Sequence, residues 1–296
     1  INMVYGAAAS GKRAMTSSSS PGVSLKQEGI SFLACAELPA VIVNVMRGGP
    51  GLGSIQPSQA DYFQATRGGG NGDYRTIVLA PANIQEAVDL TQDAFDLADR
   101  YRTPVVLLAD GMIGQMMEPI VWHDHPKADL PEKTWAAGGR RGRAHNNFIT
   151  SLLIDAPDCE RHNLAMQAKY DRIREAEVRW EQRDTQDCEI LLVAYGTPAR
   201  IAMTAVEQLR AKGISAGLFR PITLWPFPEQ QLAQLAAQES VKAILTVEMS
   251  LGQMVEDVRL SVEGKKPVHF FGRSGGITPT VAEIVRAAEE TLKGGK

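Results

Sequence analysis

The sequence predicts an α/β protein built from two doubly wound, mainly parallel β-sheets. Short runs of aliphatic and β-branched residues recur along the chain, and stretches of helical length and periodicity separate them. Buried parallel strands give continuous apolar runs because helices cover both faces of the sheet. Alternation of such strands with helices favours this layered class. The chain has 296 residues, and at roughly 100–200 residues per domain this length favours two domains.

Three apolar runs in the first half of the chain are expected to form buried strands. They are residues 40–45, 76–80 and 104–109. A helix is expected at 83–101, because apolar residues there repeat at helical spacing. Its apolar face consists of Ile84, Val88, Thr91, Phe95 and Ala98. Asn83 with Glu86 three residues later matches a capping box, which predicts where this helix begins.

The middle of the chain is expected to connect the two sheets. Strand–helix alternation stops from 118 to about 142, where Pro119, Pro126 and Pro131 interrupt the chain. A long polar helix is expected to follow at about 159–183.

A second α/β unit is expected to begin near Asp187. Its strands are predicted at residues 189–194, 214–219, 241–247 and 268–271. The predicted organisation is therefore a first domain over 1–118, a linker with a long helix over 119–186, and a second domain over 187–296.

Composition argues against several classes of partner. Lys+Arg number 31 and Asp+Glu 34, for a formal net charge of −3, so no global basic field recruits nucleic acid or anionic lipid. The longest apolar runs are too short to cross a bilayer. The cysteines, Cys35, Cys159 and Cys188, are odd in number and widely separated. They indicate a reducing, cytoplasmic compartment and supply no metal or iron–sulfur spacing.

Residues 6–12 satisfy the phosphate-loop pattern GxxxxGK, with the sequence GAAASGK. Arg13 follows, where a phosphate loop has the Ser or Thr that holds magnesium. The alanines at 7–9 favour a helix over a loop that wraps phosphate. We expect a helix packed through small residues.

Arg47 opens a glycine-rich segment, RGGPGLG, directly after the strand predicted at 40–45. The spacing is not that of a dinucleotide fingerprint. The carboxyl ends of parallel strands are nevertheless where open α/β sheets bind ligands, and a guanidinium can bind a carboxylate through two hydrogen bonds. Two interpretations remain open: a ligand-binding arginine, or one paired with a structural acid.

A second ligand-like loop, with the sequence TSSSSPG, is expected over residues 16–22, before a helix from about Val23. Helix amino termini favour anions and polar ligand atoms, although redundant capping serines would look the same. Residues 58–64 allow two similar interpretations. They form either a capped short helix or a polar strip that faces the same ligand cleft as the two loops above.

Histidines and a basic patch have mainly structural interpretations. His123 and His125 alternate in a proline-rich acidic segment without further ligands nearby, so a metal site is not expected. The patch at 140–143 lacks interleaved aromatic residues, which favours a solvated linker or subunit contact over a nucleic-acid site.

Several motifs together resemble one enzyme family. They are INMVYGAAA at 1–9, TSSSSPG at 16–22 followed by SLKQEG at 24–29, MRGGPGLG at 46–53, PSQAD at 57–61, FRPITLWPF at 219–227, VEMSLGQM at 247–254 and GRSGG at 272–276. The chain resembles the alpha subunit of the thiamine-diphosphate-dependent 2-oxoacid:ferredoxin oxidoreductases, most closely the 2-oxoisovalerate type. The resemblance extends over nearly the whole chain.

This resemblance implies a thiamine pyrimidine-binding domain followed by a transketolase-C-terminal-like domain. It implies thiamine diphosphate with Mg²⁺ shared with a beta subunit, coenzyme A as co-substrate, and [4Fe–4S] clusters in partner subunits. The implied partners are beta, gamma and ferredoxin-like delta subunits, and ferredoxin. Such enzymes convert a 2-oxo acid to acyl-CoA and carbon dioxide, and pass two electrons to ferredoxin.

The resemblance also assigns roles to individual residues. Arg47 matches the family arginine that receives the substrate carboxylate, which must be held so that the 2-carbonyl meets the cofactor. The residues expected to face the cofactor are Ser18, Ser19, Ser20, Pro21, Gly22, Gln59 and Asp61.

One departure from the family concerns the amino terminus. The family's ylid-forming glutamate and its substrate loop precede the INM segment, and the chain begins at Ile1. We expect a missing upstream segment, since an apolar helix that starts uncapped is physically unfinished. The alternatives are a 2-oxoglutarate-specific enzyme and a non-catalytic α/β scaffold subunit.

Overall fold

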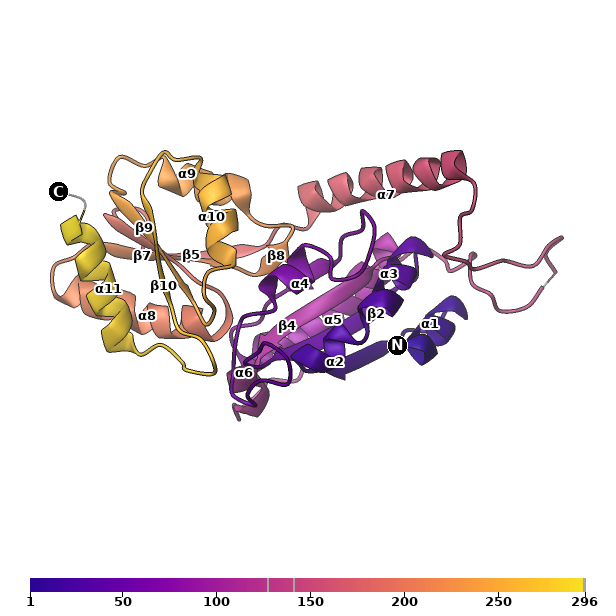
Figure 1. The fold of residues 1–296 in the computed structure, drawn as a ribbon, viewed down its shortest axis with the longest axis horizontal. Helices are drawn as coiled ribbons and strands as arrows, with labels where there is room; N and C mark the ends of the chain where they lie inside the picture. The colour runs from indigo at the N-terminus through magenta and orange to yellow at the C-terminus, as the bar shows by residue number, and fades with distance from the viewer. Residues whose placement is uncertain (127, 141, 295–296) are drawn as a thin grey trace.

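The computed structural model describes residues 1–126, 128–140 and 142–294 and contains two lobes, each built on one five-stranded sheet (Figure 1). Arg141 of the predicted basic patch and the last two residues of the predicted second domain lie outside the described residues. Both sheets are mainly parallel, which confirms the predicted fold class.

The first sheet has the strand order β1-β2-β4-β3-β8. Its strands are β1 (Met15–Ser18), β2 (Ala40–Met46), β4 (Pro104–Asp110), β3 (Ile77–Leu79) and β8 (Thr223–Trp225). All pairs are parallel except β3 with β8. The register aligns Ser18 with Asn44 and Met46 with Asp110. The carboxyl ends of β1, β2 and β4 therefore meet at one edge.

The helices of the first lobe pack on this sheet. They are α1 (Asn2–Ala9), α2 (Ser20–Ser24), α3 (Gln27–Cys35), α4 (Tyr62–Thr66), α5 (Ile84–Tyr101) and α6 (Gly111–Gln115). The predicted capping box of α5 is confirmed at its first half, because Asn83 Oδ1 accepts a hydrogen bond from Glu86 N at 2.8 Å. Glu86 Oε2 reaches one residue further back and accepts from Ala82 N at 2.8 Å.

The second sheet has the order β10-β9-β6-β7-β5. Its strands are β10 (Val268–Gly272), β9 (Ala243–Glu248), β6 (Ile190–Val193), β7 (Ala216–Pro221) and β5 (Trp180–Arg183). Its helices are α8 (Gly196–Ala211), α9 (Glu229–Ala236), α10 (Met254–Val262) and α11 (Val281–Gly294). β5 is the antiparallel edge strand of this sheet.

Alternate residues of β6 face opposite layers of the second lobe. Ile190 and Leu192 belong to the core cluster that includes the buried faces of α8 and α11. Leu191 and Val193 belong to the larger cluster, which includes α9 and α10 and continues into the first lobe. Figure 1 shows the two helix pairs on opposite sides of this sheet. One apolar core therefore runs through both lobes.

The expected long helix is α7 (Ala156–Ala176), which lies along the first lobe (Figure 1). The predicted extent to 183 is wrong, because Trp180–Arg183 form β5 and pair with β7. All four β5 residues are exposed and polar or amphipathic, so their sequence resembles a solvated helix face. Pairing with a neighbouring strand decides their structure, as is common for edge strands.

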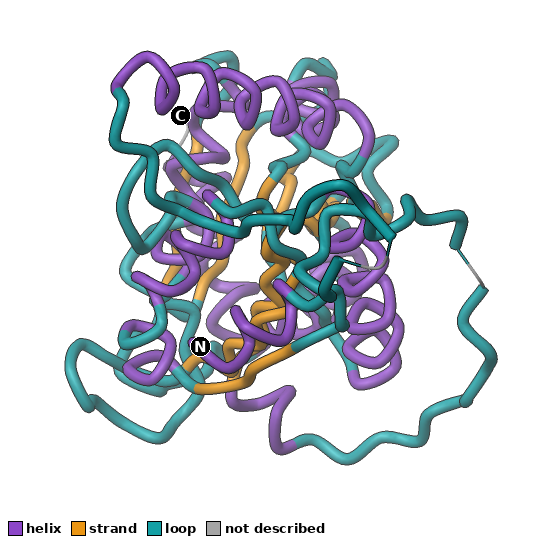
Figure 2. The backbone as a smooth tube through the Cα atoms, turned by 90° about the vertical axis from the view of Figure 1, so that its right-hand side faces the viewer, coloured by secondary structure: helices purple, strands orange, loops and turns teal. Residues whose placement is uncertain are grey.

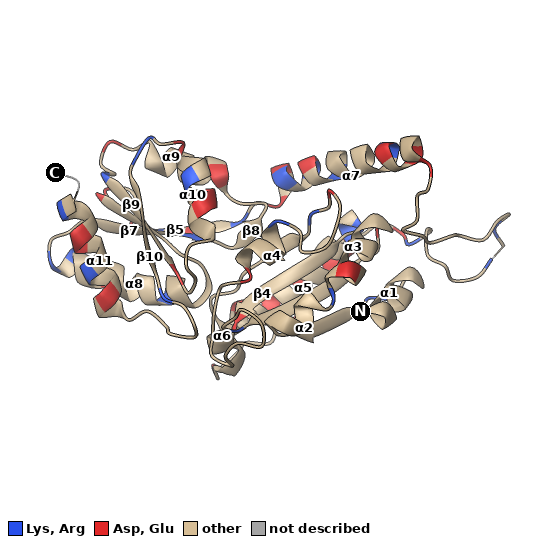
Figure 3. Ribbon diagram, viewed as in Figure 1, with Lys and Arg blue, Asp and Glu red and all other residues tan. Residues whose placement is uncertain are grey.

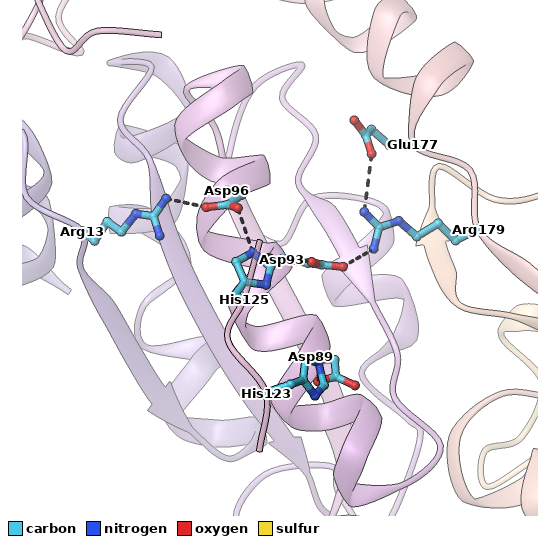
Figure 4. A network of polar contacts seen from close by, with 8 residues as sticks. All are labelled: Arg13, Asp89, Asp93, Asp96, His123, His125, Glu177 and Arg179. Carbon is cyan, nitrogen blue, oxygen red and sulfur yellow. Dashed lines mark hydrogen bonds and ion pairs between the residues drawn. The ribbon is translucent and has the colours of Figure 1, made fainter. Parts of the chain in front are cut away.

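The connection between α6 and α7 has no helix or strand over the residues that the structure describes there, which confirms the expected loss of alternation. Figure 2 shows part of it as a long loop that extends from the body of the protein. Another part crosses α5, where His125 Nε2 lies 2.8 Å from Asp96 Oδ2 (Figure 4). The segment after α7 is bonded to α5 as well, because Arg179 Nη1 donates to Asp93 Oδ2 at 2.7 Å.

Asp96 is also bonded from the opposite side. Arg13 donates to Asp96 at 2.5 Å and to Asp99 at 2.9 Å. Burial opposes ionisation of Asp96, but the hydrogen bonds from His125 and Arg13 outweigh it and hold the pKa of this carboxyl below its ordinary value. The ionised side chain of Asp96 thus attaches both the connection and the segment before β1 to α5.

Within the described residues, no helix is both long enough and apolar enough to cross a membrane.

Candidate functional site

Two of the segments singled out in the sequence meet at the carboxyl edge of the first sheet. Arg47 follows β2 directly, and its backbone N–H donates to Ser20 Oγ at 3.0 Å. Ser20 Oγ lies 3.3 Å from Arg47 O and donates to it. Because β1 and β2 are adjacent and parallel, the turn after each strand emerges at the same place. The serine-rich segment and the glycine-rich segment therefore form one structure.

The Arg47 side chain is half-buried and has no carboxylate partner among the ion pairs of the described residues. Its Nε is buried without a hydrogen-bond partner. A buried guanidinium N–H without a partner costs free energy, so such groups usually meet a ligand or water. The alternative interpretation, an arginine paired with a structural acid, finds no support in this part of the chain.

The glycine-rich segment folds back on itself as a compact loop. Gly48 N donates to Gln56 O at 2.9 Å, and Ser54 N donates to Gly48 O at 2.7 Å. Gly53 has a φ of 54°, a backbone conformation that favours glycine. A Cβ on Gly48 would lie 3.2 Å from the carbonyl carbon of Gly275, so the second lobe packs closely on this loop.

A cavity of about 550 Å³ opens between these segments and the second lobe. Its lining consists of Ser20, Pro21, Ser24, Gly49, Pro50, Gly51, Ala60, Asp61, Leu251, Gln253 and Ser274. Its volume lies within the range of about 300–1,000 Å³ that is typical of ligand pockets. Three segments predicted from the sequence thus line one cavity, together with two loops of the second lobe.

Asp61 is held in this cavity by a residue that sequence reasoning missed. Asn44, on β2, is buried and donates from Nδ2 to Asp61 Oδ2 at 3.0 Å. Asn44 Oδ1 is buried and has no hydrogen-bond partner. The only signal in the sequence was a polar residue that interrupts an otherwise apolar strand.

Gln59 is positioned differently from Asp61. Its amide is fully buried; Nε2 donates to Tyr195 O at 2.9 Å, and Oε1 accepts from Met249 N at 3.0 Å. The backbone N–H of Gln59 also donates to Met249 O at 2.8 Å. Both ends of the side-chain amide therefore bond the backbone of the second lobe, and the residue does not line the cavity.

The serine-rich segment is not a loop throughout. Met15–Ser18 form the edge strand β1, and α2 begins at Ser20 rather than near Val23, so the expected loop is confined to the Ser19 position. Pairing with β2 overrides the polar sequence here. Ser18 ends the strand, and Gly22 approaches it so closely that an added Cβ would collide with Ser18 Oγ.

Glu248 supports the loop of the second lobe that reaches the cavity. It is buried at the end of β9 and accepts hydrogen bonds from Ser250 Oγ at 2.8 Å and from the backbone N–H groups of residues 253–255 at 2.9–3.1 Å. Burial raises the pKa of this carboxyl, although these hydrogen bonds oppose the shift. The carboxylate orders the segment that carries Leu251 and Gln253.

The GxxxxGK segment and His123, which were also singled out in the sequence, form ordinary structure. Residues 6–9 of the GxxxxGK pattern belong to α1, and Gly11 follows in a left-handed turn with a φ of 84°. His123 lies 3.4 Å from Asp89 (Figure 4). Over the described residues, no set of three or more His, Cys, Asp or Glu side chains is arranged to hold a metal ion.

Comparison with known families covers nearly the whole chain. Residues 1–184 match the family described as pyruvate flavodoxin/ferredoxin oxidoreductase, thiamine diphosphate-binding, and residues 188–284 match the pyruvate:ferredoxin oxidoreductase core domain II. The chain belongs to the 2-oxoacid:ferredoxin oxidoreductase family. It is an alpha-type subunit of such an enzyme, and its residues 1–184 match the family's thiamine diphosphate-binding domain. The family resemblance stated from the sequence motifs is confirmed.

Curated relatives refine this placement. The chain is 52% identical over 290 residues to ketoisovalerate oxidoreductase subunit VorB of Methanothermobacter marburgensis. This alignment covers 98% of the chain and 81% of that protein. It is 35% identical over 310 residues to 2-oxoglutarate synthase subunit KorA of Methanocaldococcus jannaschii, and this alignment covers 97% of the chain and 83% of that protein.

Solved structures share the fold. A 2-oxoglutarate:ferredoxin oxidoreductase from Magnetococcus marinus, with 2-oxoglutarate, coenzyme A and succinyl-CoA bound, matches with a TM-score of 0.78 at 21% identity, over 98% of this chain and 55% of that one. A split-gene transketolase, an inactive beta4 tetramer, matches with a TM-score of 0.59 at 16% identity, over 99% of this chain and 80% of that one.

Proposed function

We propose that this chain is the alpha subunit of a cytoplasmic enzyme that oxidatively decarboxylates a branched 2-oxo acid, foremost 2-oxoisovalerate. The 2-oxo acid and the thiol of coenzyme A yield acyl-CoA, carbon dioxide, one proton and two electrons, and ferredoxin accepts the electrons. Support comes from 52% and 51% identity to two ketoisovalerate oxidoreductase subunits, against 35–37% to the 2-oxoglutarate synthase subunits.

Arg47 is the observation that carries this proposal. Its side chain is half-buried directly after β2, two residues before Gly49 of the cavity lining, although Arg47 itself does not belong to that lining. It has no ion-pair partner among the described residues, and its Nε is buried without a hydrogen-bond partner. A substrate carboxylate would satisfy it and be fixed in orientation. The Ser20 hydrogen bonds to the Arg47 backbone hold the base of this side chain in place.

The residues of the cavity fit the pyrimidine and substrate side of thiamine diphosphate. Asp61 offers a carboxylate, and the Ser20 and Ser24 hydroxyls, which each donate and accept one hydrogen bond within the protein, keep one lone pair each for a further donor. Asn44, which holds Asp61 but does not line the cavity, has a buried Oδ1 without a partner. Bound thiamine would supply the electron sink for decarboxylation. Of the described residues, no cluster of acids, histidines or cysteines fits Mg²⁺, so a beta subunit is proposed to hold the metal and the diphosphate.

Gln59 has a supporting role in this proposal. Its amide joins the two lobes and fixes the position of the segment that carries Asp61. Ser18, Ser19 and Gly22 are likewise proposed to shape the turn between β1 and α2, while Ser20 and Pro21 face the cofactor.

Exposed apolar side chains around the cavity support a partner subunit that closes it. Leu251 lines the cavity and is 83% exposed, and Leu25 and Leu52, which follow lining residues, are 88% and 81% exposed. Clustered apolar exposure marks interaction surfaces. We place the beta subunit here. The [4Fe–4S] clusters are assigned to partner subunits, because such a cluster needs several grouped thiolates and Cys35, Cys159 and Cys188 do not form such a group.

The test is to purify the assembled complex and measure coenzyme-A-dependent ferredoxin reduction with four 2-oxo acids in parallel. These are 2-oxoisovalerate, 2-oxoglutarate, pyruvate and an aryl 2-oxo acid. We expect the highest kcat/KM with 2-oxoisovalerate. Preference for 2-oxoglutarate would replace the substrate assignment, and no activity with any of them would overturn the proposed function.

A substitution tests the role of Arg47 separately. Arg47→Ala should lower kcat/KM at least tenfold, about 1.4 kcal/mol or more of transition-state stabilisation, while thiamine binding is retained. Arg47→Lys keeps the positive charge but cannot form two parallel hydrogen bonds to a carboxylate, so its kcat/KM should lie between those of the parent and Arg47→Ala. Lys12→Ala, an exposed cation of the GxxxxGK segment, is the control and should leave kinetics unchanged. Unchanged kinetics for Arg47→Ala would remove the assignment.

A further inference from the structure

A second cavity, of about 480 Å³, lies on another part of the junction between the lobes. Its walls come from the end of α4, the segment before β3, the end of α7 and the connection from β8 to α9. It shares no lining residue with the first cavity, which Ser20, Gly49 and Asp61 help to line. Figure 1 shows these elements around the carboxyl end of α7, where the chain enters the second lobe. The proposed function gives this cavity no role.

Three arginines from three elements line this cavity: Arg67, Arg75 and Arg174. Arg67 donates to Asp257 Oδ1 at 2.9 Å, and Tyr62 occupies the other carboxylate oxygen. Arg75 bonds only a backbone carbonyl, and neither it nor Arg174 forms an ion pair within the described residues. Two guanidinium groups are therefore available to an anion.

The cavity also has an aromatic floor. Trp225 and Phe227 are both buried and both belong to its lining. The Arg174 guanidinium lies 5.9 Å from the centre of the Trp225 ring, within the range of a cation–π contact. Tyr170 packs edge-on against the same ring at 5.7 Å, which fixes its orientation. The small exposed parts of these two rings therefore form the apolar part of the cavity wall, next to the Arg174 guanidinium.

The rest of the lining limits how much negative charge fits. Glu175 and Glu229 are exposed at the cavity, so a polyphosphate would meet repulsion as well as attraction. Figure 3 shows acidic and basic residues side by side at this end of α7. Carboxylates can accept hydrogen bonds from ribose hydroxyls, as in dinucleotide sites. The side-chain amides of Gln230 and Gln231 can pair with the edge of a base.

We propose that this cavity binds a nucleoside monophosphate. The phosphate contacts Arg75 and Arg174, the base packs on the Trp225 and Phe227 surface, and the ribose lies toward the two glutamates. Arginine suits this role because its planar group binds phosphate oxygens in pairs and stacks on aromatic rings. A free mononucleotide and the adenosine phosphate end of coenzyme A share this chemistry.

The experiment measures binding by calorimetry to the purified complex that contains the full chain, with AMP, adenosine and inorganic phosphate as separate probes. AMP should bind at least tenfold more tightly than either fragment. Arg174→Ala should weaken AMP binding at least tenfold. Arg172→Ala is the matched control, because it removes an exposed arginine of the same helix that does not line the cavity. Its AMP affinity should be unchanged.

Coenzyme A distinguishes the two sources of the ligand. If coenzyme A displaces AMP and itself binds more weakly to Arg174→Ala, the site holds the end of the co-substrate. If AMP binds equally well in saturating coenzyme A, the ligand is a free nucleotide. Both results support the site. Absence of AMP binding, equal binding of phosphate alone, or equal loss in Arg174→Ala and Arg172→Ala would overturn the proposal. No turnover is measured, so this test is independent of the proposed function.

Discussion

Replacing Gln59 with methionine should loosen the joint between the two lobes. Methionine has nearly the same length and volume but no strong hydrogen-bonding group. The change removes the bonds of the amide to Tyr195 O, at 2.9 Å, and to Met249 N, at 3.0 Å. Both backbone groups belong to residues that are 1% exposed, so water cannot replace the amide.

The magnitude follows from these two groups. A buried polar group left without a partner costs roughly 1–3 kcal/mol, so two of them should reduce the free energy of unfolding by about 2–6 kcal/mol. Gln64→Met is the matched control on the neighbouring helix. The Gln64 amide donates to Ser24 Oγ at 2.9 Å near the surface, and its Oε1 already lacks a partner. That variant should lose no more than about 1.5 kcal/mol.

Urea-induced unfolding of the purified chain, followed by tryptophan fluorescence, measures both variants against the parent. Hydrogen exchange of the Met249 amide gives a local readout, and its protection should fall in Gln59→Met only. If Gln59→Met is no more destabilising than Gln64→Met, the amide does not join the lobes and the reasoning fails.

Two further predictions concern charged residues. Arg220 is 3% exposed and bonds Glu86 of the first lobe and Glu181 of β5. Because the two carboxylates are 28% and 44% exposed and water can solvate them, Arg220→Met should cost about 2–3 kcal/mol, and thermal unfolding of the variant checks this. The pKa of Asp96 is lowered by folding, so its contribution to stability is present above the unfolded pKa and disappears as pH falls through the folded one. Unfolding curves of Asp96→Asn and the parent should therefore differ near neutrality and converge in strong acid. A constant difference across pH would contradict this.

Much of the fold was predictable because the buried parallel strands have strong signals. β2, β4, β6 and β9 are apolar runs covered on both faces, and their positions followed from the runs of aliphatic residues in the sequence. The strands β1, β5 and β8 were not predicted. β1 and β5 are polar edge strands, and β8 has three residues and is separated from β7 by Ile222 alone. Their structure depends on pairing partners elsewhere in the chain.

Part of the candidate site could be proposed from local features of the sequence. Arg47 and Asp61 lie next to strands or turns whose chemistry is visible locally, and the position of Arg47 follows from the rule on strand ends. The partners of Gln59 are 136 and 190 residues away in the sequence. No local pattern distinguishes an amide that faces a ligand from one that joins two lobes. The same holds for Asn44, whose unpaired oxygen is visible only in three dimensions.

The placement of β8 has a consequence for dissecting the protein. Its three residues, Thr223–Trp225, follow most of the second sheet in the sequence, yet they pair with β3 and complete the first sheet. A fragment cut at residue 186 would expose the edge of β3 and uncover Tyr170, against which Trp225 packs. Unpaired edges invite aggregation. The amino-terminal lobe would therefore need a grafted β8 peptide to be produced alone, and fragment complementation between the halves should proceed through this strand.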